Sequence, residues 1–425
     1  MNAARPPSGR RWVVLGAYML LTLVVEVQWV ALAPVARAAA RFYAGPGGEA
    51  PDVDLLAMLY LVVYLVASVP ASYVIDTYGI RRGLSVGAAL AAAGGLLKAL
   101  LAGRFGAVLA GQGLLALAQP FVLNAATAVA ARWFPLRERG LANGLAALAQ
   151  YLGIVLAMVV GPAVVVGDAS SPRYGEGVPA LLLAYGAATV LGALATLLLV
   201  PERPAVPVEG GEERLGALDG MRSLLRGRDY RLLLVLFTAG LGVFNALSSM
   251  VDAVAAHIGV EDSDGLIGAF MIAGGIVGAL VLPIASDALR RRKPFLVLCM
   301  AGMVPGVAGL AFADDLASTP AGAYLVAKIA AAVLGFFVMS AGPIGFQYAA
   351  EIGRPAPEST SQGLLLLAGQ ASGIAFMLAM ASARWVGPML TLFALLSIGC
   401  LAGAMLLRES PVFTGAGTAS NGEDR

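Results

Sequence analysis

Charged side chains are scarce in this chain of 425 residues. Asp, Glu, Lys and Arg together make up 13% of the sequence, whereas a soluble globular chain carries roughly 25%. Hydrophobic residues make up 59%, and the mean hydropathy is +0.83. Such a chain cannot cover itself with a polar surface, which excludes a soluble globular protein.

Cysteine and histidine are also nearly absent. The two cysteines, Cys299 and Cys400, fall in apolar stretches without metal-ligand spacing, and we expect both to be small packing residues. The single histidine, His257, lies where an apolar stretch ends. We therefore predict neither a metal site nor a cofactor.

Two sequence motifs that would indicate other functions are missing. There is no GxxxxGK[ST] loop, so ATP does not drive the protein directly. There is no HExxH and no soluble output domain, which leaves a membrane enzyme or a signalling receptor as an alternative without a visible site. The net charge of +2 gives no reason to expect a nucleic-acid partner.

What the chain has in abundance is long apolar stretches. About 20 apolar residues in a helix cross the ~30 Å hydrocarbon core of a bilayer. We predict an all-α, polytopic membrane protein with twelve transmembrane helices and the lipid bilayer as a partner. The predicted spans are 12–36, 54–75, 84–102, 106–131, 141–165, 178–200, 231–256, 265–286, 295–313, 321–347, 362–381 and 385–407.

One long polar loop divides the spans into two sets of six. It runs from Pro201 to Arg231 and is rich in Glu, Gly, Pro and Arg. We predict an N-terminal six-helix half (1–200), a cytoplasmic linker (201–231), a C-terminal six-helix half (232–408) and a disordered cytoplasmic tail (409–425).

The placement of basic residues predicts the orientation, because Lys and Arg concentrate in cytoplasmic loops. If the N-terminus is cytoplasmic, most arginines fall in the inside segments, and the outside loops are rich in acidic residues. We therefore predict a multi-pass protein of the plasma (inner) membrane with both termini cytoplasmic.

The two halves share a charged loop at corresponding positions. Asp76 to Arg82 follows the second span, and Ser286 to Lys293 follows the eighth. Both resemble the signature loop of the major facilitator superfamily, which implies two pseudo-symmetric six-helix halves that rock around a midplane site. The alternative is ordinary positive-inside topology. Our candidates for gating in these loops are Asp76, Arg81, Arg82, Asp287 and Arg291.

Four ionisable residues interrupt the apolar spans, at a cost of roughly 2.5–3.5 kcal/mol for a charge at a helix centre. Glu26 lies midway along the first span and is a candidate proton carrier or counter-charge; the alternative is a buried, neutral or lysine-paired carboxyl. We expect Lys98 and Lys328 to extend toward the membrane interface. Asp252, near the outer end of the seventh span, is a candidate gate residue.

Aromatic and amide side chains lie in the spans that line the cavity in the superfamily. An aromatic face beside amides suits a small amine, because cation–π attraction contributes about 0.5–2 kcal/mol. The alternative for each amide is hydrogen bonding between packed helices. Our candidate substrate-binding residues are Gln28, Trp29, Tyr60, Gln119, Phe244, Asn245, Phe346, Gln347 and Gln370.

A narrower resemblance extends from the first span to the eleventh. The segments that carry it include Gln28-Trp29, Leu56 to Tyr64, Asp76-Thr77, Gly111-Gln112, Ala118-Gln119, Trp133-Phe134, Leu334 to Phe337, Gly345-Phe346, Glu351-Ile352, Pro357-Glu358 and Gly363 to Leu365 with Gln370. In this order and spacing the chain resembles the feline leukaemia virus subgroup C receptor-type transporters.

That resemblance implies facilitated transport of choline and ethanolamine, with haem export an older proposal for the family. It implies that Trp29 faces the cation and that Gln119 and Gln370 are polar cavity residues. The chain departs from the family at two positions. Asn245, beside Phe244, stands where a second cavity aromatic is expected, and Glu26 introduces an acid where the family is apolar.

We therefore expect a monomeric transporter that moves a small polar or cationic metabolite, such as a choline- or ethanolamine-like amine, by alternating access. The alternative is a proton-coupled exporter of amphipathic compounds or of haem and other porphyrins, with Glu26 as the proton carrier.

Overall fold

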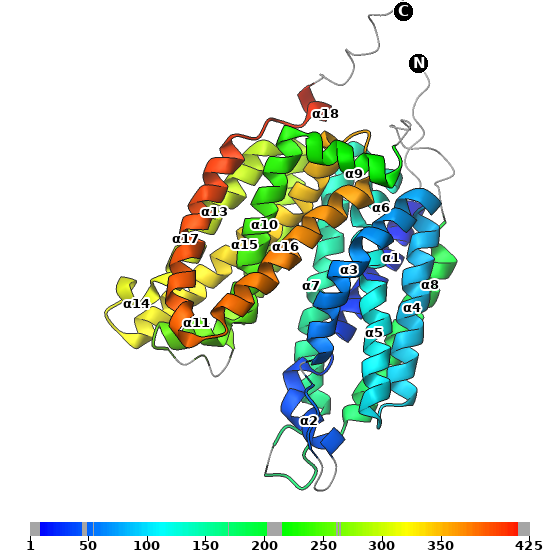
Figure 1. The fold of residues 1–425 in the computed structure, drawn as a ribbon, viewed down its shortest axis with the longest axis vertical. Coiled ribbons are helices and arrows are strands. Elements are labelled where there is room, and N and C mark those ends of the chain that lie inside the picture. Colours follow the sequence, from blue (N-terminus) through cyan, green and yellow to red (C-terminus); the bar gives the residue numbers. More distant parts are fainter. Residues whose placement is uncertain are drawn as a thin grey trace, which may run out of the picture. The chain divides into compact units, whose positions relative to one another are not determined.

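The computed structural model describes residues 9–44, 49–53, 55–168, 170–201, 215–260, 262 and 265–414. The chain forms two compact units (Figure 1). The first consists of Met1–Phe134 and Leu148–Gly211, and the second of Pro135–Ala147 and Glu212–Arg425. The predicted linker residues 202–214 and tail residues 415–425 lie outside the described residues.

The first unit is built from long helices and short connecting helices. They are α1 (Arg10–Trp29), η1 (Ala33–Val35), α2 (Ala36–Ala44), α3 (Leu55–Tyr78), α4 (Ile80–Leu100), α5 (Phe105–Leu123), α6 (Ala126–Trp133), most of α7 (Arg139–Val164) and α8 (Val178–Leu199). Helix α4 packs against both α5 and α8, while α1 packs against α8 and α5.

The second unit begins with η2 (Leu136–Glu138) and the start of α7. Its other helices are α9 (Ala217–Arg226), α10 (Arg228–Ser249), α11 (Val251–His257), α12 (Leu266–Leu289), α13 (Lys293–Ala311), α14 (Ala313–Leu316), α15 (Pro320–Ile352), α16 (Glu358–Met380), α17 (Ala383–Met405) and α18 (Pro411–Thr414). The closest helix pairs are α12 with α15, α13 with α15, and α10 with α16.

Twelve helical segments within the described residues are long and apolar enough to cross a membrane, which confirms the predicted all-α, twelve-span class. Many apolar side chains on these helices point outward; Leu198 and Val66, for example, are 79% and 76% exposed. In a bilayer such a surface is covered by lipid, and the helices satisfy their own backbone groups.

The first span is broken, although the sequence predicted one continuous span over 12–36. Helix α1 ends at Trp29, and the short η1 helix follows at Ala33–Val35 before α2 continues. The cause is Pro34, whose ring in a continuous helix would clash with the carbonyl of Val30, four residues earlier. The first membrane segment, Arg10–Ala44, therefore contains a non-helical step.

The seventh span is shorter than the predicted 231–256. Helix α10 ends at Ser249, and α11 is a separate seven-residue helix. The Ser248 hydroxyl donates to the carbonyl of Asn245 at 3.2 Å, and such local bonds favour helix ends over helix interiors. Asp252 consequently lies in α11, beyond the membrane-crossing helix, and its side chain lies outside the described residues.

The predicted linker and the start of the tail, which was predicted to be disordered, contain helices. The predicted linker holds α9, and the predicted tail begins with a placed segment that ends in α18. The Tyr348 hydroxyl donates to the carbonyl of Arg408 at 2.7 Å, and the Glu409 carboxylate accepts from the backbone N–H of Arg292 at 2.7 Å. These bonds fix the chain after α17 against the rest of the second unit.

Glycines allow α12 and α15 to touch along their backbones. A Cβ atom added at Gly335 would lie 1.8 Å from the carbonyl oxygen of Met271, and one at Gly278 would lie 2.0 Å from that of Phe336. No side chain can relieve a clash with backbone, so close contact of these helices requires glycine.

We expect the Gly335→Ala substitution to lower the thermal midpoint of the purified protein by several degrees, because overpacking costs about 1–3 kcal/mol. Gly342→Ala on the same helix is the matched control, since its added Cβ would make only an ordinary 3.7 Å contact with Phe346. Fluorescence-detected size exclusion after heating measures both variants. Equal midpoints would contradict the close contact of α12 and α15.

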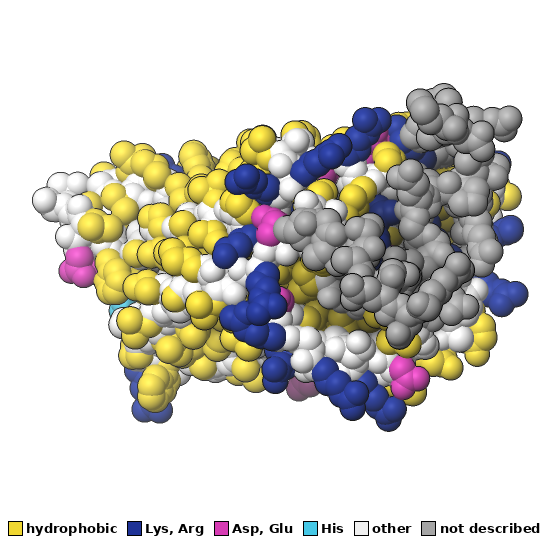
Figure 2. All heavy atoms as spheres, turned by 90° about the horizontal axis from the view of Figure 1, so that it is seen from above, with side chains coloured by type: hydrophobic (Ala, Val, Ile, Leu, Met, Phe, Trp, Pro, Cys, Tyr) yellow, Lys and Arg dark blue, Asp and Glu magenta, His cyan; other side chains and the backbone are white. Residues whose placement is uncertain are grey.

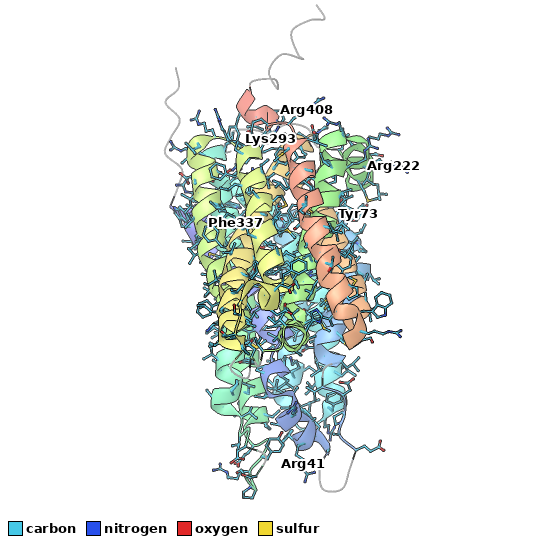
Figure 3. All side chains as sticks on the ribbon, turned by 90° about the vertical axis from the view of Figure 1, so that its left-hand side faces the viewer. Arg41, Tyr73, Arg222, Lys293, Phe337 and Arg408 are labelled. Atoms are coloured by element: carbon cyan, nitrogen blue, oxygen red, sulfur yellow. The ribbon has the colours of Figure 1, made fainter. Side chains whose placement is uncertain are left out.

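One end of the second unit is rich in basic side chains. Seen from the end that carries α9 and α18, the surface shows many Lys and Arg side chains and few acidic ones (Figure 2). In the second unit, Arg222, Lys293 and Arg408 all lie at this end, whereas Phe337 lies further along the helices (Figure 3).

Candidate functional site

Glu26 is a buried carboxylate in the first unit. Its side chain on α1 is fully buried, and Oε1 accepts a hydrogen bond from Gln119 Nε2 on α5 at 3.2 Å. Its second oxygen, Oε2, has no hydrogen-bond partner among the described residues. Because a buried charge without a partner is costly, this oxygen is a candidate acceptor for a bound solute.

A glycine on α7 makes room for this carboxylate. A Cβ added at Gly153 would lie 2.4 Å from the carbonyl oxygen of Leu23 and 2.9 Å from Cβ of Glu26. Helix α7 therefore contacts the backbone of α1 directly beside Glu26. A larger side chain at this position would push α1 away.

Four buried tyrosines of the first unit, Tyr18, Tyr60, Tyr64 and Tyr151, lie within electrostatic range of the Glu26 carboxyl group. Tyr18 donates to the carbonyl of Val122 at 2.9 Å, and Tyr64 donates to Asn124 Oδ1 at 2.6 Å. The buried Tyr60 hydroxyl, by contrast, has no partner among the described residues. Tyr60 and Glu26 thus both present unused polar oxygens.

Trp29 lies against Tyr60. The two rings stack with their centroids 6.4 Å apart and an angle of 26° between their planes. The indole Nε1 donates to the carbonyl of Ala57 on α3 at 3.1 Å. Because this bond uses the one polar group of the indole, Trp29 can offer a solute only its π surface.

Lys98 does not extend to the membrane interface, contrary to the expectation from the sequence. Its side chain on α4 is 1% exposed, and its ammonium donates to Gln28 Oε1 at 2.7 Å and to Gln112 Oε1 at 2.5 Å. The two amide oxygens hold the ammonium inside the unit. Their hydrogen bonds replace those that the ammonium would make with water at the membrane interface. Gln28 is accordingly a partner of Lys98.

A small cavity adjoins this lysine. It has a volume of about 10 Å³, which is enough for one water molecule. Its lining includes Gln28, Trp29, Leu56, Lys98 and Gln112.

In the second unit, two of the predicted substrate-binding amides, one on α10 and one on α16, form a hydrogen bond. Asn245 Nδ2 donates to Gln370 Oε1 at 3.2 Å, and both side chains are partly exposed. A Cβ added at Gly373 would lie 2.8 Å from Cβ of Asn245, so a glycine on α16 permits this approach. Phe244 is also partly exposed, and Phe346 packs against Phe237 with ring centroids 5.3 Å apart.

Gln347 belongs to a different group. Its Nε2 donates to Glu351 Oε1 at 2.9 Å, and its Oε1 accepts from Asn143 Nδ2 at 3.1 Å. Glu351 in turn accepts from Arg292 Nη2 at 3.0 Å. Gln347 therefore lies in a buried ionic cluster and not beside Asn245 and Gln370.

Arg292 is the centre of that cluster. The side chain is fully buried, and Nη1 donates to Asp287 Oδ1 at 2.6 Å. Burial by itself lowers the pKa of the guanidinium, but the charges of Glu351 and Asp287 outweigh burial and raise the pKa above its ordinary value. The predicted partner, Arg291, is exposed instead. The backbone turn after Asp287 directs Arg292 inward and leaves Arg290 and Arg291 exposed.

Asp287 also contacts the start of α7. Its Oδ2 accepts from the backbone N–H of Leu141 at 3.0 Å. A Cβ added at Gly140 would lie 2.6 Å from both carboxylate oxygens, so a larger residue here would displace the Asp287 side chain. The partial positive charge of a helix N-terminus favours a carboxylate in this place.

The corresponding loop of the first unit is a tight turn. Helix α3 ends at Tyr78, and α4 begins at Ile80 after Gly79, whose φ of 100° favours glycine. Asp76 is half-buried, whereas Arg81 and Arg82 are exposed. Asp76 and Arg81 each interact with other residues.

The structure thus sorts the predicted residues into separate groups. Glu26, Trp29, Tyr60 and Gln119 gather in the first unit, Asn245 and Gln370 pair in the second, and Gln28 and Gln347 bind internal charges. Sequence reasoning missed Gln112, Arg292 and Glu351 as partners. The sequence could have indicated these three residues, because each is a polar residue within or next to an apolar span.

Comparisons with known proteins agree with this architecture. The family model of the Major Facilitator Superfamily matches residues 14–377. The chain is 32% identical to solute carrier family 49 member A3 of Danio rerio, covering 87% of this chain and 77% of that protein. It is 28% identical to the choline/ethanolamine transporter FLVCR1 of Felis catus, covering 88% of this chain and 67% of that protein.

A solved structure shows the same fold. The proton:xylose symporter XylE, bound to 6-bromo-6-deoxy-D-glucose, superposes with a TM-score of 0.75 at 15% identity, covering 95% of this chain and 97% of that chain. The family model, the curated relatives and the fold all lead to one assignment: the chain belongs to the Major Facilitator Superfamily and is a multi-pass membrane transporter, not an enzyme.

Proposed function

We propose that this transporter moves a small primary or quaternary amine, of the choline or ethanolamine kind, by alternating access. The observation that carries the proposal is the buried Glu26 carboxylate, whose Oε2 has no partner, next to the stacked rings of Trp29 and Tyr60. A cation brought to this place would gain both a charge partner and an aromatic face.

Two relatives support the chemical class. FLVCR1 of Felis catus and FLVCR2 of Homo sapiens, which are 28% and 25% identical to this chain, are both choline/ethanolamine transporters. Gln119, which lies beside Glu26 in the first unit, supplies an amide group for a hydroxyl such as both amino alcohols carry.

Glu26 favours a primary ammonium within this class. The unused acceptors Glu26 Oε2 and Tyr60 Oη can receive N–H donors from a primary amine. A quaternary ammonium has no N–H and can gain only electrostatic and cation–π attraction. We therefore propose that ethanolamine is preferred over choline.

The aromatic contribution can be tested at Trp29. We expect Trp29→Ala to raise the half-saturation concentration for uptake of labelled choline and ethanolamine into proteoliposomes by about 2- to 30-fold, the equivalent of 0.5–2 kcal/mol. Trp29→Phe should retain part of the affinity, because phenylalanine keeps a smaller π face. Trp385→Ala is the control, since that indole is 50% exposed on α17 in the other unit.

If no amine shows saturable uptake, and Trp29→Ala equals the Trp385→Ala control, the amine proposal is wrong. A thermal-shift screen of amines, amino alcohols, vitamins and porphyrins would then identify the class that binds, because a bound solute stabilises the native state.

A second candidate function is proton-coupled export of amphipathic compounds. The observation that favours it is the same carboxylate, whose one described hydrogen bond comes from a neutral amide, Gln119 Nε2. A buried carboxyl of this kind can hold a proton in one step of a cycle and release it in another.

We further propose that the protein lies in the plasma (inner) membrane with both termini cytoplasmic. The basic side chains at the end that carries α9 and α18 support this orientation (Figures 2 and 3), because Lys and Arg accumulate on the cytoplasmic side.

A further inference from the structure

The break in the first span leaves helix carbonyls without helical partners. The last carbonyls of α1, which ends at Trp29, cannot accept from a following turn because the helix stops. The C-terminal end of a helix also carries a partial negative charge of roughly half a unit. Inside a membrane such a place attracts a cation or a donor.

Two side chains from neighbouring helices fill this place. Gln112 Nε2 on α5 donates to the carbonyls of Gln28 at 3.2 Å and Trp29 at 3.1 Å. It also lies 3.1 Å from the carbonyl of Leu56. The Lys98 ammonium lies 3.4 Å from the Gln28 carbonyl, in addition to its two short amide contacts. The ammonium is therefore surrounded by three oxygens.

The orientation of both amides is fixed by their other contacts. Gln28 Nε2 donates to Thr189 Oγ1 at 3.1 Å, and that hydroxyl donates to the carbonyl of Tyr185 at 2.7 Å. Gln112 Nε2 is committed to the backbone carbonyls. Both amide oxygens consequently point at Lys98, and neither amide can reverse without losing these bonds.

No carboxylate among the described residues balances this lysine. Among the described residues, Lys98 has no ion-pair partner, and it is held by neutral oxygens alone. A Cβ added at Gly111 would lie 2.7 Å from Cγ of Lys98, so a glycine on α5 is what admits the side chain. Transporters commonly bind cations at oxygens of this kind, which belong to unwound backbone carbonyls and to the C-terminal ends of interrupted helices.

We propose that the oxygens of Gln28 and Gln112 form a cation site at the break of α1, filled by the chain's own Lys98 ammonium. In this arrangement Lys98 is a positioning residue, because it ties the end of α1, and with it Trp29, to α4. When Lys98 is replaced by a shorter residue, a small primary ammonium ion is the class of ligand that fits the site. This proposal rests on the broken helix and does not depend on the transported solute.

The test is chemical rescue of Lys98→Ala. The substitution removes three methylene groups and the ammonium, which together correspond to propylammonium. We expect the variant to lose about 5 °C or more in thermal midpoint, because the buried amide oxygens of Gln28 and Gln112 lose their shared donor. Propylammonium chloride should restore most of that loss. Tetramethylammonium chloride, a cation without N–H donors, should not.

Two controls separate this site from general salt effects and from the transport site. Lys328→Ala removes a partly buried lysine of the second unit that lies over the Tyr324 ring at 4.3 Å, and it should show no rescue. Trp29→Ala should likewise gain nothing specific from propylammonium beyond the wild-type response. If the wild-type protein shows no saturable amine uptake while propylammonium still rescues Lys98→Ala, the proposed function is refuted and the cation site is supported.

Lys98→Met keeps the proposal testable if the alanine variant does not fold. Methionine fills the space without the charge, so we expect a lower midpoint than wild type and no response to propylammonium. The proposal is overturned if Lys98→Met is as stable as wild type. It is also overturned if propylammonium and tetramethylammonium act alike on Lys98→Ala.

Discussion

Ethanolamine uptake by the Glu26→Gln variant is expected to fall about 10- to 100-fold. A hydrogen bond to a charged group contributes about 1.5–3 kcal/mol, and each 1.4 kcal/mol corresponds to a factor of ten. Glutamine keeps the size of the side chain and the contact with Gln119, so the loss reports on charge and not on packing. Initial uptake rates in proteoliposomes, measured over a range of concentrations, give the change.

The same variant distinguishes the two candidate functions. If Glu26 is a counter-charge, ethanolamine should lose more affinity than choline, and exchange and net uptake should fall together. If Glu26 carries a proton, uphill transport should be abolished while exchange persists, and the pH dependence should disappear. A pH dependence equal to that of wild type would exclude the proton-carrier role.

Glu49→Gln provides the matched control. Glu49 is exposed in the described part of the first unit, and its replacement removes the same charge without touching a buried group. Uptake by this variant should equal that of wild type. A similar loss in both variants would mean that overall charge, and not the Glu26 site, governs uptake.

The largest effect on stability is expected for Arg292→Met. The fully buried guanidinium binds Asp287 and Glu351, so its removal leaves two carboxylates buried without compensation. Such a loss costs about 3–5 kcal/mol. We expect little folded protein in detergent, measured as the monodisperse fraction in fluorescence-detected size exclusion and its thermal midpoint.

Arg291→Ala is the control next in sequence. Its side chain is exposed, and its backbone carbonyl, which accepts from Ser286 Oγ, is unchanged by the substitution. This variant should match wild type. A combined Arg292→Met, Asp287→Asn and Glu351→Gln variant should recover much of the lost stability, because it removes the uncompensated charges along with the arginine. If Arg292→Met is as stable as Arg291→Ala, the cluster does not stabilise the second unit.

The class of fold could be predicted from the sequence because hydropathy reports directly on the surrounding solvent. Stretches of about 20 apolar residues leave only membrane-crossing helices as a solution. The breaks within spans were harder to predict, although Pro34 gave a local signal for the end of α1. The end of α10 at Ser249 had only a weak signal, the two serines at its terminus.

The hydrogen-bond and ion-pair partners of polar side chains within the spans were less predictable than the spans themselves. Lys98 was expected at the interface because a long side chain can reach water, but two amides from α1 and α5 lie closer. Arg291 and Arg292 are adjacent and chemically identical, and only the turn after Asp287 decides that Arg292 points inward. Gln347 was grouped with the cavity amides, whereas Glu351, one helical turn away, binds it.

The amino-acid sequence by itself determined that this protein is a twelve-span helical transporter with a buried acid in its first span, since composition and apolar length are properties of the chain. Only the tertiary structure decided which polar groups satisfy one another and which remain unused, as with Glu26 Oε2 and the Tyr60 hydroxyl. The physical reason is that a hydrogen bond between helices needs its donor and acceptor at about 2.7–3.2 Å, so shifts of a few tenths of an ångström decide whether it forms. Helix packing sets these distances, including the glycines that allow backbones to touch.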